Sequence, residues 1–138
     1  MGRGPRLGRR VRAVDRRVRG AGAPLKVLDL TEFFSPLGGG VRTYLSAKAR
    51  WFAGREDHSH VLVVPGARDA KREWLGSTRY EIGGPPAPAS PGYHILTGWG
   101  RLRRILERER PDVVELGSIY LAPWFLRQAM RRTPIPTI

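Results

Sequence analysis

The sequence of 138 residues contains no cysteine. Without thiols, the chain can form neither a disulfide framework nor a thiolate metal site. The absence of cysteine fits a reducing compartment. We therefore expect a cytoplasmic protein, with a position at the inner membrane face left open as an alternative.

Long hydrophobic runs are also absent. The longest apolar runs, at residues 61–65 and 119–126, fall far short of the roughly 20 residues that a membrane-spanning helix needs. The basic N-terminus has no apolar core, so it does not read as a secretory signal. Hydrophobic residues still make up 41% of the chain and include four tryptophans, which indicates one globular domain with a core.

Acidic residues are few. The chain has 12 of them against 25 lysines and arginines, which gives a net charge of +13. Residues 1–24 hold eight arginines and a single acid, Asp15, so more than half of the net charge lies there. We interpret 1–24 as a disordered Arg-rich extension and 25–138 as the domain. A misassigned start, or nonspecific binding of this segment to anionic surfaces, are the alternatives.

The first unit of the domain consists of a strand, a loop and a helix. Apolar residues 25–30 predict a strand covered on both faces, and the proline and glycines of residues 31–40 predict a loop. Helical spacing then begins at Val41 and ends near Gly54. Its apolar stripe contains Val41, Leu45 and Phe52, with Tyr44 and Trp51 beside it, and its basic residues are expected to face solvent: Arg42, Lys48, Arg50 and Arg55.

Strands and helices alternate along the rest of the chain. We expect strands at 60–64, 78–82 and 112–116, helices at 98–110 and 122–132, and the start of a further strand at 135–138. Residues 65–77 read as an exposed connection with at most one helical turn, and 83–92 as a proline-restricted loop. This order predicts an α/β fold, a Rossmann-like three-layer domain with a mostly parallel sheet. Ligands of such folds bind at the carboxyl ends of the strands.

Three consecutive glycines, Gly38, Gly39 and Gly40, follow the first strand and precede the helix. They let a ligand approach the backbone, and the free N–H groups of the helix start favour an anion. The pattern is not the dinucleotide fingerprint, because Thr43 stands where the last glycine belongs, and no P-loop lysine follows. Arg42 could reach the same anion. The alternative is a merely flexible turn.

Other candidates lie in loops that follow strands. Tyr93 and His94 fall in the proline-rich loop, and Ser118 follows the fourth strand. Capping of the next helix is the favoured role of Ser118, and contact with substrate is the alternative. Glu115 closes that strand, where we expect it to face the cleft rim or an arginine.

The histidines and aromatic residues have plainer interpretations. His58 and His60 have no further metal ligands nearby in the sequence. We therefore expect both histidines at the surface or at a strand edge, and no metal site. Trp51 and Phe52 have helical spacing that favours core packing over a membrane-facing surface. No catalytic nucleophile motif is present.

Three segments resemble a known family. They are Asp-Leu-Thr-Glu-Phe-Phe-Ser-Pro-Leu-Gly-Gly-Gly-Val-Arg-Thr-Tyr-Leu, His-Val-Leu-Val-Val-Pro-Gly and Arg-Pro-Asp-Val-Val-Glu-Leu-Gly-Ser, within residues 25–138. Together they are similar to the N-terminal domain of GT-B glycosyltransferases, above all family 4, whose retaining enzymes include mannosyltransferases.

The resemblance implies half of a two-domain fold, in which this domain holds the acceptor and its glycine loop touches the donor diphosphate. Gly38, Gly39 and Gly40 would then bind donor phosphate. The acceptor side would be lined by Arg42, Tyr93, His94 and Ser118. A GDP- or UDP-sugar donor and a glycan, polyol or lipid acceptor are implied, with peripheral membrane contact as an option. The residues imply no metal or other cofactor and no specific nucleic acid.

The chain also departs from that family. The C-terminal domain with its paired glutamates is absent, and the family's histidine after the fifth strand would fall beyond Ile138. Where many relatives have His-x-His, this chain has Glu115-Leu116-Gly117. The expectation is therefore a truncated chain with no catalytic residue of its own and no activity alone. The alternatives are a stand-alone nucleotide- or phosphate-binding module and a nucleic-acid-associated protein that uses residues 1–24.

Overall fold

The computed structural model describes residues 23–138, so nearly all of the predicted extension lies outside the described residues. A five-stranded sheet with the order β3-β4-β2-β1-β5 forms the centre of the domain. In chain order the elements are β1 (Leu25–Leu30), α1 (Gly40–Ala53), β2 (His58–Gly66), β3 (Ala70–Trp74), β4 (Ser77–Gly83), α2 (Trp99–Glu109), β5 (Val113–Leu116) and α3 (Ala122–Ala129).

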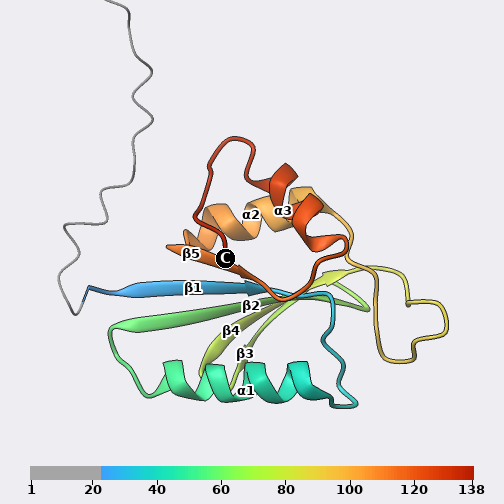
Figure 1. The fold of residues 1–138 in the computed structure, drawn as a ribbon, viewed down its shortest axis with the longest axis horizontal. Helices are drawn as coiled ribbons and strands as arrows, with labels where there is room; N and C mark the ends of the chain where they lie inside the picture. Colours follow the sequence, from blue (N-terminus) through green and yellow to red (C-terminus); the bar gives the residue numbers. More distant parts are fainter. Residues whose placement is uncertain (1–22) are drawn as a thin grey trace, which may run out of the picture.

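The sheet is parallel except at one edge, and helices cover both of its faces. β1 pairs in parallel with β2 and β5, and β2 pairs in parallel with β4. α1 lies on one face, and α2 and α3 lie on the other (Figure 1). The predicted Rossmann-like three-layer fold is therefore confirmed. No helix in residues 23–138 is long and apolar enough to cross a bilayer.

The core has two parts because successive side chains of a strand point to opposite faces of the sheet. Leu28 and Leu30 pack with residues of α2 and α3, such as Leu102 and Leu126. On the other face, a smaller cluster joins α1 to β2 and contains Phe34, Leu45, Leu62 and Val64. Burial on both faces explains why the central strands read as nearly continuous apolar runs.

Residues 65–77 do not form the exposed connection that the sequence predicted. β2 continues to Gly66, and Ala70–Trp74 forms an antiparallel edge strand with β4. Leu75 and Gly76 join these strands with φ values of 52° and 82°. Two residues of positive φ between paired strands are the geometry of a tight hairpin. The polar side chains of β3 that suggested a loop suit an edge strand, where charges discourage pairing with other chains.

The other elements lie close to their predicted positions. α1, α2 and β5 begin and end within two residues of the prediction, whereas α3 ends three residues early, at Ala129. Residues 135–138 run alongside β5, where Ile138 N–H donates to the Val114 carbonyl (2.9 Å) and Leu116 N–H donates to the Ile138 carbonyl (2.8 Å). In place of the predicted start of a strand, the structure has a single parallel bridge between Thr137 and Val114.

The apolar stripe of α1 is rotated relative to the prediction. Leu45 and Phe52 are buried as expected, and Ala49 completes the stripe. Val41 is 36% exposed and Trp51 is 52% exposed, where it lies under the guanidinium of Arg55. The expectation that Trp51 packs in the core is therefore wrong. The turn of α1 that faces the sheet instead brings a charged side chain inward, as described below.

Glu109, in the last turn of α2, links this helix to the sheet. Its carboxylate accepts hydrogen bonds from the Tyr80 hydroxyl and from Lys26 Nζ (3.2 Å). Burial alone would raise the pKa of Glu109, but these two hydrogen bonds and the nearby lysine charges lower it below the ordinary 4.5. The ionised carboxylate is therefore stabilised by folding.

We expect this stabilisation to make folding acid-sensitive. It is fully present above pH 4.5, the ordinary value, and is lost as the pH falls through the lower pKa of the folded state. In urea denaturation, acidification below pH 4.5 should lower the free energy of unfolding more in the parent than in Glu109→Gln. The exposed neighbour variant Glu107→Gln should follow the parent. Identical pH profiles for the parent and Glu109→Gln would contradict the expectation.

Candidate functional site

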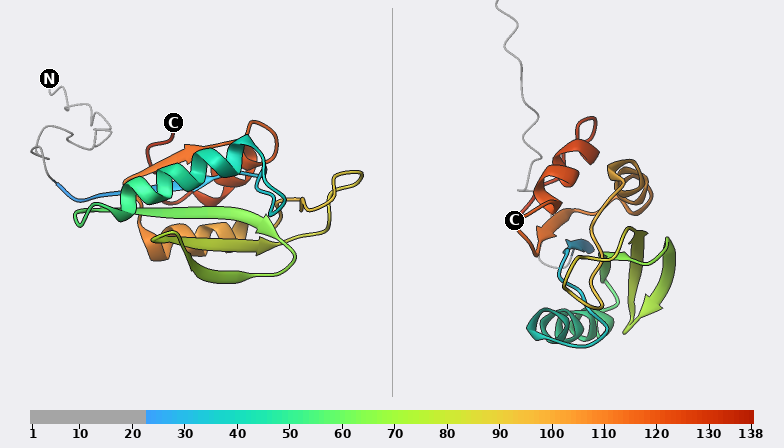
Figure 2. Two further views of the ribbon diagram at one scale, coloured as in Figure 1. Left: turned by 90° about the horizontal axis from the view of Figure 1, so that it is seen from below. Right: turned by 90° about the vertical axis from the view of Figure 1, so that its right-hand side faces the viewer.

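The loops that follow β1, β4 and β5 gather at the carboxyl end of the sheet. α1 starts at this end, and the long loop of residues 84–98 extends beyond it (Figure 2). Gly92 lies against the glycine loop, since a Cβ atom added there would be 3.0 Å from Ser35 Oγ and 3.3 Å from Leu37 Cδ1. Segments far apart in the sequence therefore meet at the edge where ligands of such folds bind.

The glycine turn has an open backbone in a conformation that favours glycine. Gly38 and Gly39 have φ values of 106° and 111°, which other residues rarely adopt. A Cβ atom added to Gly38, Gly39 or Gly40 would meet nothing within 4 Å, so the turn faces open space. α1 begins at Gly40 with no side-chain cap and no acid in its first turn. Its first N–H groups and its positive end are therefore available to an anion.

Arg42 holds the glycine loop in this conformation. Its guanidinium donates to the Pro36 carbonyl, which lies six residues earlier in the loop. Gly38 N–H donates to the Ser35 carbonyl (3.3 Å), and Leu37 N–H donates to Ser35 Oγ (3.2 Å). These contacts fix the turn before α1. Contact of Arg42 with an acceptor remains a prediction.

Tyr93 and His94 form the neck of the loop of residues 84–98. His94 pairs with Pro86 in an antiparallel bridge, and Ala87 N–H donates to the Tyr93 carbonyl (2.9 Å). Both side chains are partly buried. Because their neighbour Gly92 lies against the glycine loop, they belong to the same edge of the domain as Gly38.

Ser118 does not cap the next helix, contrary to the favoured prediction. The cap comes from Glu32, in the loop after β1, whose carboxylate accepts from Leu121 N–H (3.0 Å) and Ala122 N–H (3.2 Å). Ser118 Oγ donates to the same carboxylate (2.8 Å). Ser118 precedes the first residue of α3 by four positions, too far for an N-cap side chain. Glu32 thus ties the loop after β1 to the loop after β5.

Replacing Glu32 with alanine should lower the free energy of unfolding by about 1–2 kcal/mol, the usual cost of a lost helix cap. Amide hydrogen exchange at Leu121 and Ala122 should accelerate, because both N–H groups lose their acceptor. Glu107→Ala, an exposed acid within α2, serves as the control for urea denaturation and exchange. Unchanged exchange at these two amides would show that Glu32 does not hold the helix start.

A buried polar network lies between α1 and the sheet. Asp29 accepts from His60 Nε2 (2.6 Å) and from Lys48 Nζ (3.0 Å), and His60 Nδ1 lies 2.7 Å from Ser77 Oγ. Asp29, His60 and Ser77 are each at most 3% exposed. Two predictions are therefore wrong: Lys48 does not face solvent, and His60 is not at the surface. Buried charges need partners, and these residues provide them for one another.

The network reaches the surface through Glu115. Its carboxylate accepts from Lys48 Nζ (2.5 Å) and from the Tyr44 hydroxyl (2.9 Å). The expectation was the cleft rim or an arginine; the structure instead pairs Glu115 with a lysine, and its side chain stays partly exposed. Burial alone would lower the pKa of Lys48, but the bonds to Glu115 and Asp29 raise it. Burial and the bond to Glu115 raise the pKa of Tyr44. A charged Lys48 thus anchors α1, which carries the glycine turn, to β1 and β5.

The sequence interpretation did not identify Asp29, Glu32 or Lys48 as important. One signal was present: Asp29 is the only charged residue between Val27 and Leu30, within an otherwise apolar strand. A carboxylate in such a position is costly unless it is paired, so a partner could have been sought. Nothing in the local pattern marked Glu32 as a helix cap, because the helix lies about 90 residues later.

A mostly parallel α/β domain with an open glycine turn at the carboxyl ends of its strands belongs to the Rossmann-like class, whose ligands bind at that edge of the sheet. Comparison with known proteins narrows the class. Residues 39–138 match the family described as "Glycosyl transferase 4-like domain", and the chain belongs to this family. The family resemblance noted in the sequence is thereby confirmed.

A curated relative is the GDP-mannose-dependent alpha-(1-6)-phosphatidylinositol dimannoside mannosyltransferase of Mycobacterium tuberculosis (strain ATCC 25177 / H37Ra). It is 30% identical over 96 residues, which cover 68% of this chain and 24% of the relative. The chain therefore spans about a quarter of that enzyme's length.

Proposed function

We propose that this chain is the acceptor-side, N-terminal half of a retaining glycosyltransferase that moves a sugar from a nucleotide-sugar donor to a lipid, polyol or glycan acceptor. The observation that carries the proposal is the glycine turn, which is open and uncapped at the start of α1 in a chain of the glycosyl transferase 4-like family. In this proposal the protein works in the cytoplasm, with the inner membrane face as the alternative location.

The glycine turn would stabilise the leaving group. As the bond between sugar and diphosphate breaks, negative charge develops on the diphosphate oxygens. N–H groups of Gly38, Gly39 and Gly40 and the positive end of α1 would face that charge. Because Arg42 and Glu32 already hold the loop and its neighbours, little reorganisation is needed when the donor binds.

The acceptor would lie along the same edge. Arg42 lies in the first turn of α1, and Tyr93, His94 and Ser118 lie in loops that meet at this edge, which supports their proposed role on the acceptor side. Exposed apolar residues share this edge: Phe33 packs edge-to-face on Tyr120, and Leu37 and Ile119 are more than 80% exposed. The name of the mycobacterial relative gives GDP-mannose as its donor and a phosphatidylinositol lipid as its acceptor. Among the proposed substrates, we therefore favour a lipid acceptor and a GDP-sugar.

A nitrogen-15 NMR titration of the 138-residue chain tests the donor site. GDP-mannose and UDP-glucose should shift the amide signals of Gly38–Gly40 and the first turn of α1, and free mannose should not. One half of a cleft should bind weakly, in the range of about 1 mM or above, which corresponds to roughly 4 kcal/mol or less. Signals that move elsewhere while those of the glycine turn stay fixed would refute the phosphate role.

The same titration separates the proposal from a stand-alone nucleotide- or phosphate-binding module. The observation that favours this module is that the uncapped helix start lies wholly within this chain. A complete site would bind the nucleotide about a thousandfold more tightly, near 1 μM. Such affinity would show that the chain is a stand-alone nucleotide-binding module, whereas weak binding supports the proposal that it forms one wall of a shared cleft.

A further inference from the structure

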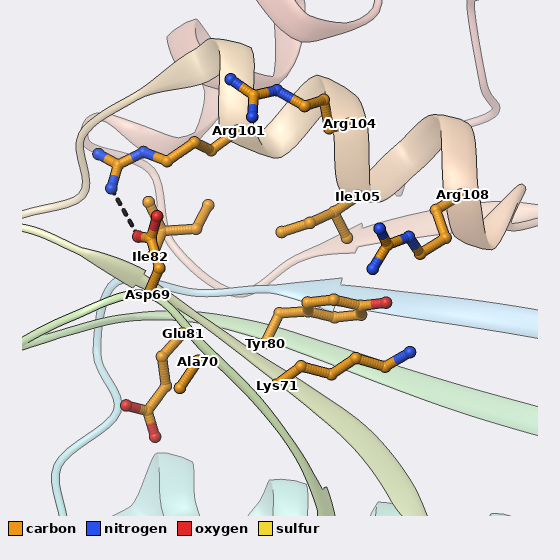
Figure 3. Close-up of a pocket in the computed structure, with 10 residues that line it drawn as sticks. All are labelled: Asp69, Ala70, Lys71, Tyr80, Glu81, Ile82, Arg101, Arg104, Ile105 and Arg108. Atoms are coloured by element: carbon orange, nitrogen blue, oxygen red, sulfur yellow. Dashed lines mark hydrogen bonds and ion pairs between the residues drawn. The ribbon is translucent and has the colours of Figure 1, made fainter.

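A second concave site lies on the opposite face of the sheet from α1 and the glycine turn. It is a cavity of about 340 Å³ between α2 and the hairpin of β3 and β4 (Figure 3). Its lining residues come from these three elements and from the short turn before β3: Asp69, Ala70, Lys71, Tyr80, Glu81, Ile82, Arg101, Arg104, Ile105 and Arg108.

Basic side chains gather on the walls of this cavity. Arg101, Arg104 and Arg108 stand three and four residues apart, so they share one side of α2. Lys71 lines the opposite wall, on β3. Figure 3 shows the Arg108 guanidinium pointing from the helix toward Lys71 and Tyr80, whereas the Arg104 side chain extends along α2 toward Arg101. Like charges this close repel one another, which disfavours the arrangement unless an anion joins it.

The acidic side chains of the cavity already have partners. Asp69 accepts hydrogen bonds from Gly83 N–H (2.7 Å) and from Arg101 (2.6 Å). Both bonds lower the pKa of Asp69, and the bond from the Gly83 backbone has the larger effect. Glu81 accepts from Arg79 (2.5 Å), and its carboxylate points away from α2 in Figure 3. Within residues 23–138, no ion pair engages Arg104, Arg108 or Lys71. Arg104 and Lys71 act on Asp69 and Glu109 only through their charges, so no carboxylate in this part of the chain contacts the three cations directly.

The floor of the cavity is apolar and rigid. Ile82 and the Tyr80 ring are at most 5% exposed, and Ile105 is 9% exposed. Lys71 Nζ lies 5.4 Å from the centre of the Tyr80 ring, which is a cation–π contact. The Tyr80 hydroxyl is fixed by Glu109. Such a floor with a cationic rim suits a compact ring that carries phosphate.

We propose that this cavity binds a small phosphate ester, with Arg104, Arg108 and Lys71 holding the phosphate and Ile82, Ile105 and Tyr80 supporting its ring. Arginine favours phosphate because its planar fork can donate two parallel hydrogen bonds. The volume of 340 Å³ lies at the lower end of small-molecule sites, which fits one ring and one phosphate. The site is separate from the glycine turn and does not depend on the proposed transferase function.

Titration calorimetry of the full chain at low salt tests the site with glucose 6-phosphate as the probe and glucose as the uncharged comparison. Arg104→Gln/Arg108→Gln should weaken binding of glucose 6-phosphate by roughly tenfold or more for each lost arginine. Arg50→Gln/Arg127→Gln is the matched control: it removes the same charge from exposed positions on α1 and α3. Lys71→Gln, on β3, tests the site from the other wall without altering α2.

The source of the phosphate is distinguished by a second probe. Vesicles containing phosphatidylglycerol, compared with phosphatidylcholine vesicles, present the same phosphate chemistry on a lipid. If the parent binds glucose 6-phosphate and the Arg104→Gln/Arg108→Gln variant does not, the ligand is a soluble phosphate ester. If the parent binds only the phosphatidylglycerol vesicles and the same variant does not, the ligand is a lipid headgroup. Equal losses in the two double variants would reduce the effect to overall charge and overturn the site. No binding of either probe would overturn it too.

Discussion

Replacing Asp29 with alanine is expected to lower the free energy of unfolding by about 3–5 kcal/mol, the usual effect of breaking a buried ion pair. The carboxylate accepts hydrogen bonds from His60 and Lys48, and it is 2% exposed. Without it, Lys48 keeps only Glu115, and the buried His60 loses the partner of its Nε2 atom. Urea denaturation of the parent and the variant measures the difference.

Two controls make this expectation specific. Glu107→Ala removes an exposed acid and should change the free energy of unfolding by less than about 0.5 kcal/mol. Lys48→Met should also destabilise the domain, and combining it with Asp29→Ala should cost less than the sum of the single effects, because the two side chains contact each other. Strict additivity would indicate that the contact between Asp29 and Lys48 contributes nothing.

Replacing Gly39 with valine is expected to remove the NMR response of α1 to GDP-mannose, with affinity reduced by about tenfold or more. Two effects act together. A φ value of 111° is strained for a β-branched residue, and the new side chain would enter the open space in which the diphosphate is proposed to lie.

The control for this variant is Gly100→Val in α2. A Cβ atom at Gly100 also meets nothing within 4 Å, and that position lies on the opposite face of the sheet. The amide signals of Gly38–Gly40 and the first turn of α1 in this variant should shift with GDP-mannose as they do in the parent. Circular dichroism shows whether each variant is folded. A folded Gly39→Val chain that binds GDP-mannose like the parent would exclude the glycine turn as the phosphate site.

Two of the sequence predictions that were wrong concern residues whose position depends on partners in other elements of the fold. β3 was missed because its exposed side chains follow no alternating pattern, and only the pairing with β4 makes it a strand. The inward position of Lys48 was missed because helical spacing allows a basic residue at the border of the buried face to point either way. Its carboxylate partners lie 19 and 67 residues away along the chain.

The sequence by itself determined the alternation of strands and helices, the mostly parallel sheet and the place of the glycine turn after the first strand. These follow from periodicity and turn residues, which act over a few neighbouring positions. The tertiary structure alone decided that Asp29, His60 and Lys48 form a buried network, that Glu32 caps α3, and that Arg108 points toward Lys71. Such pairs are set by which strands and helices lie side by side, because charged groups respond to neighbours in space and not to neighbours along the chain.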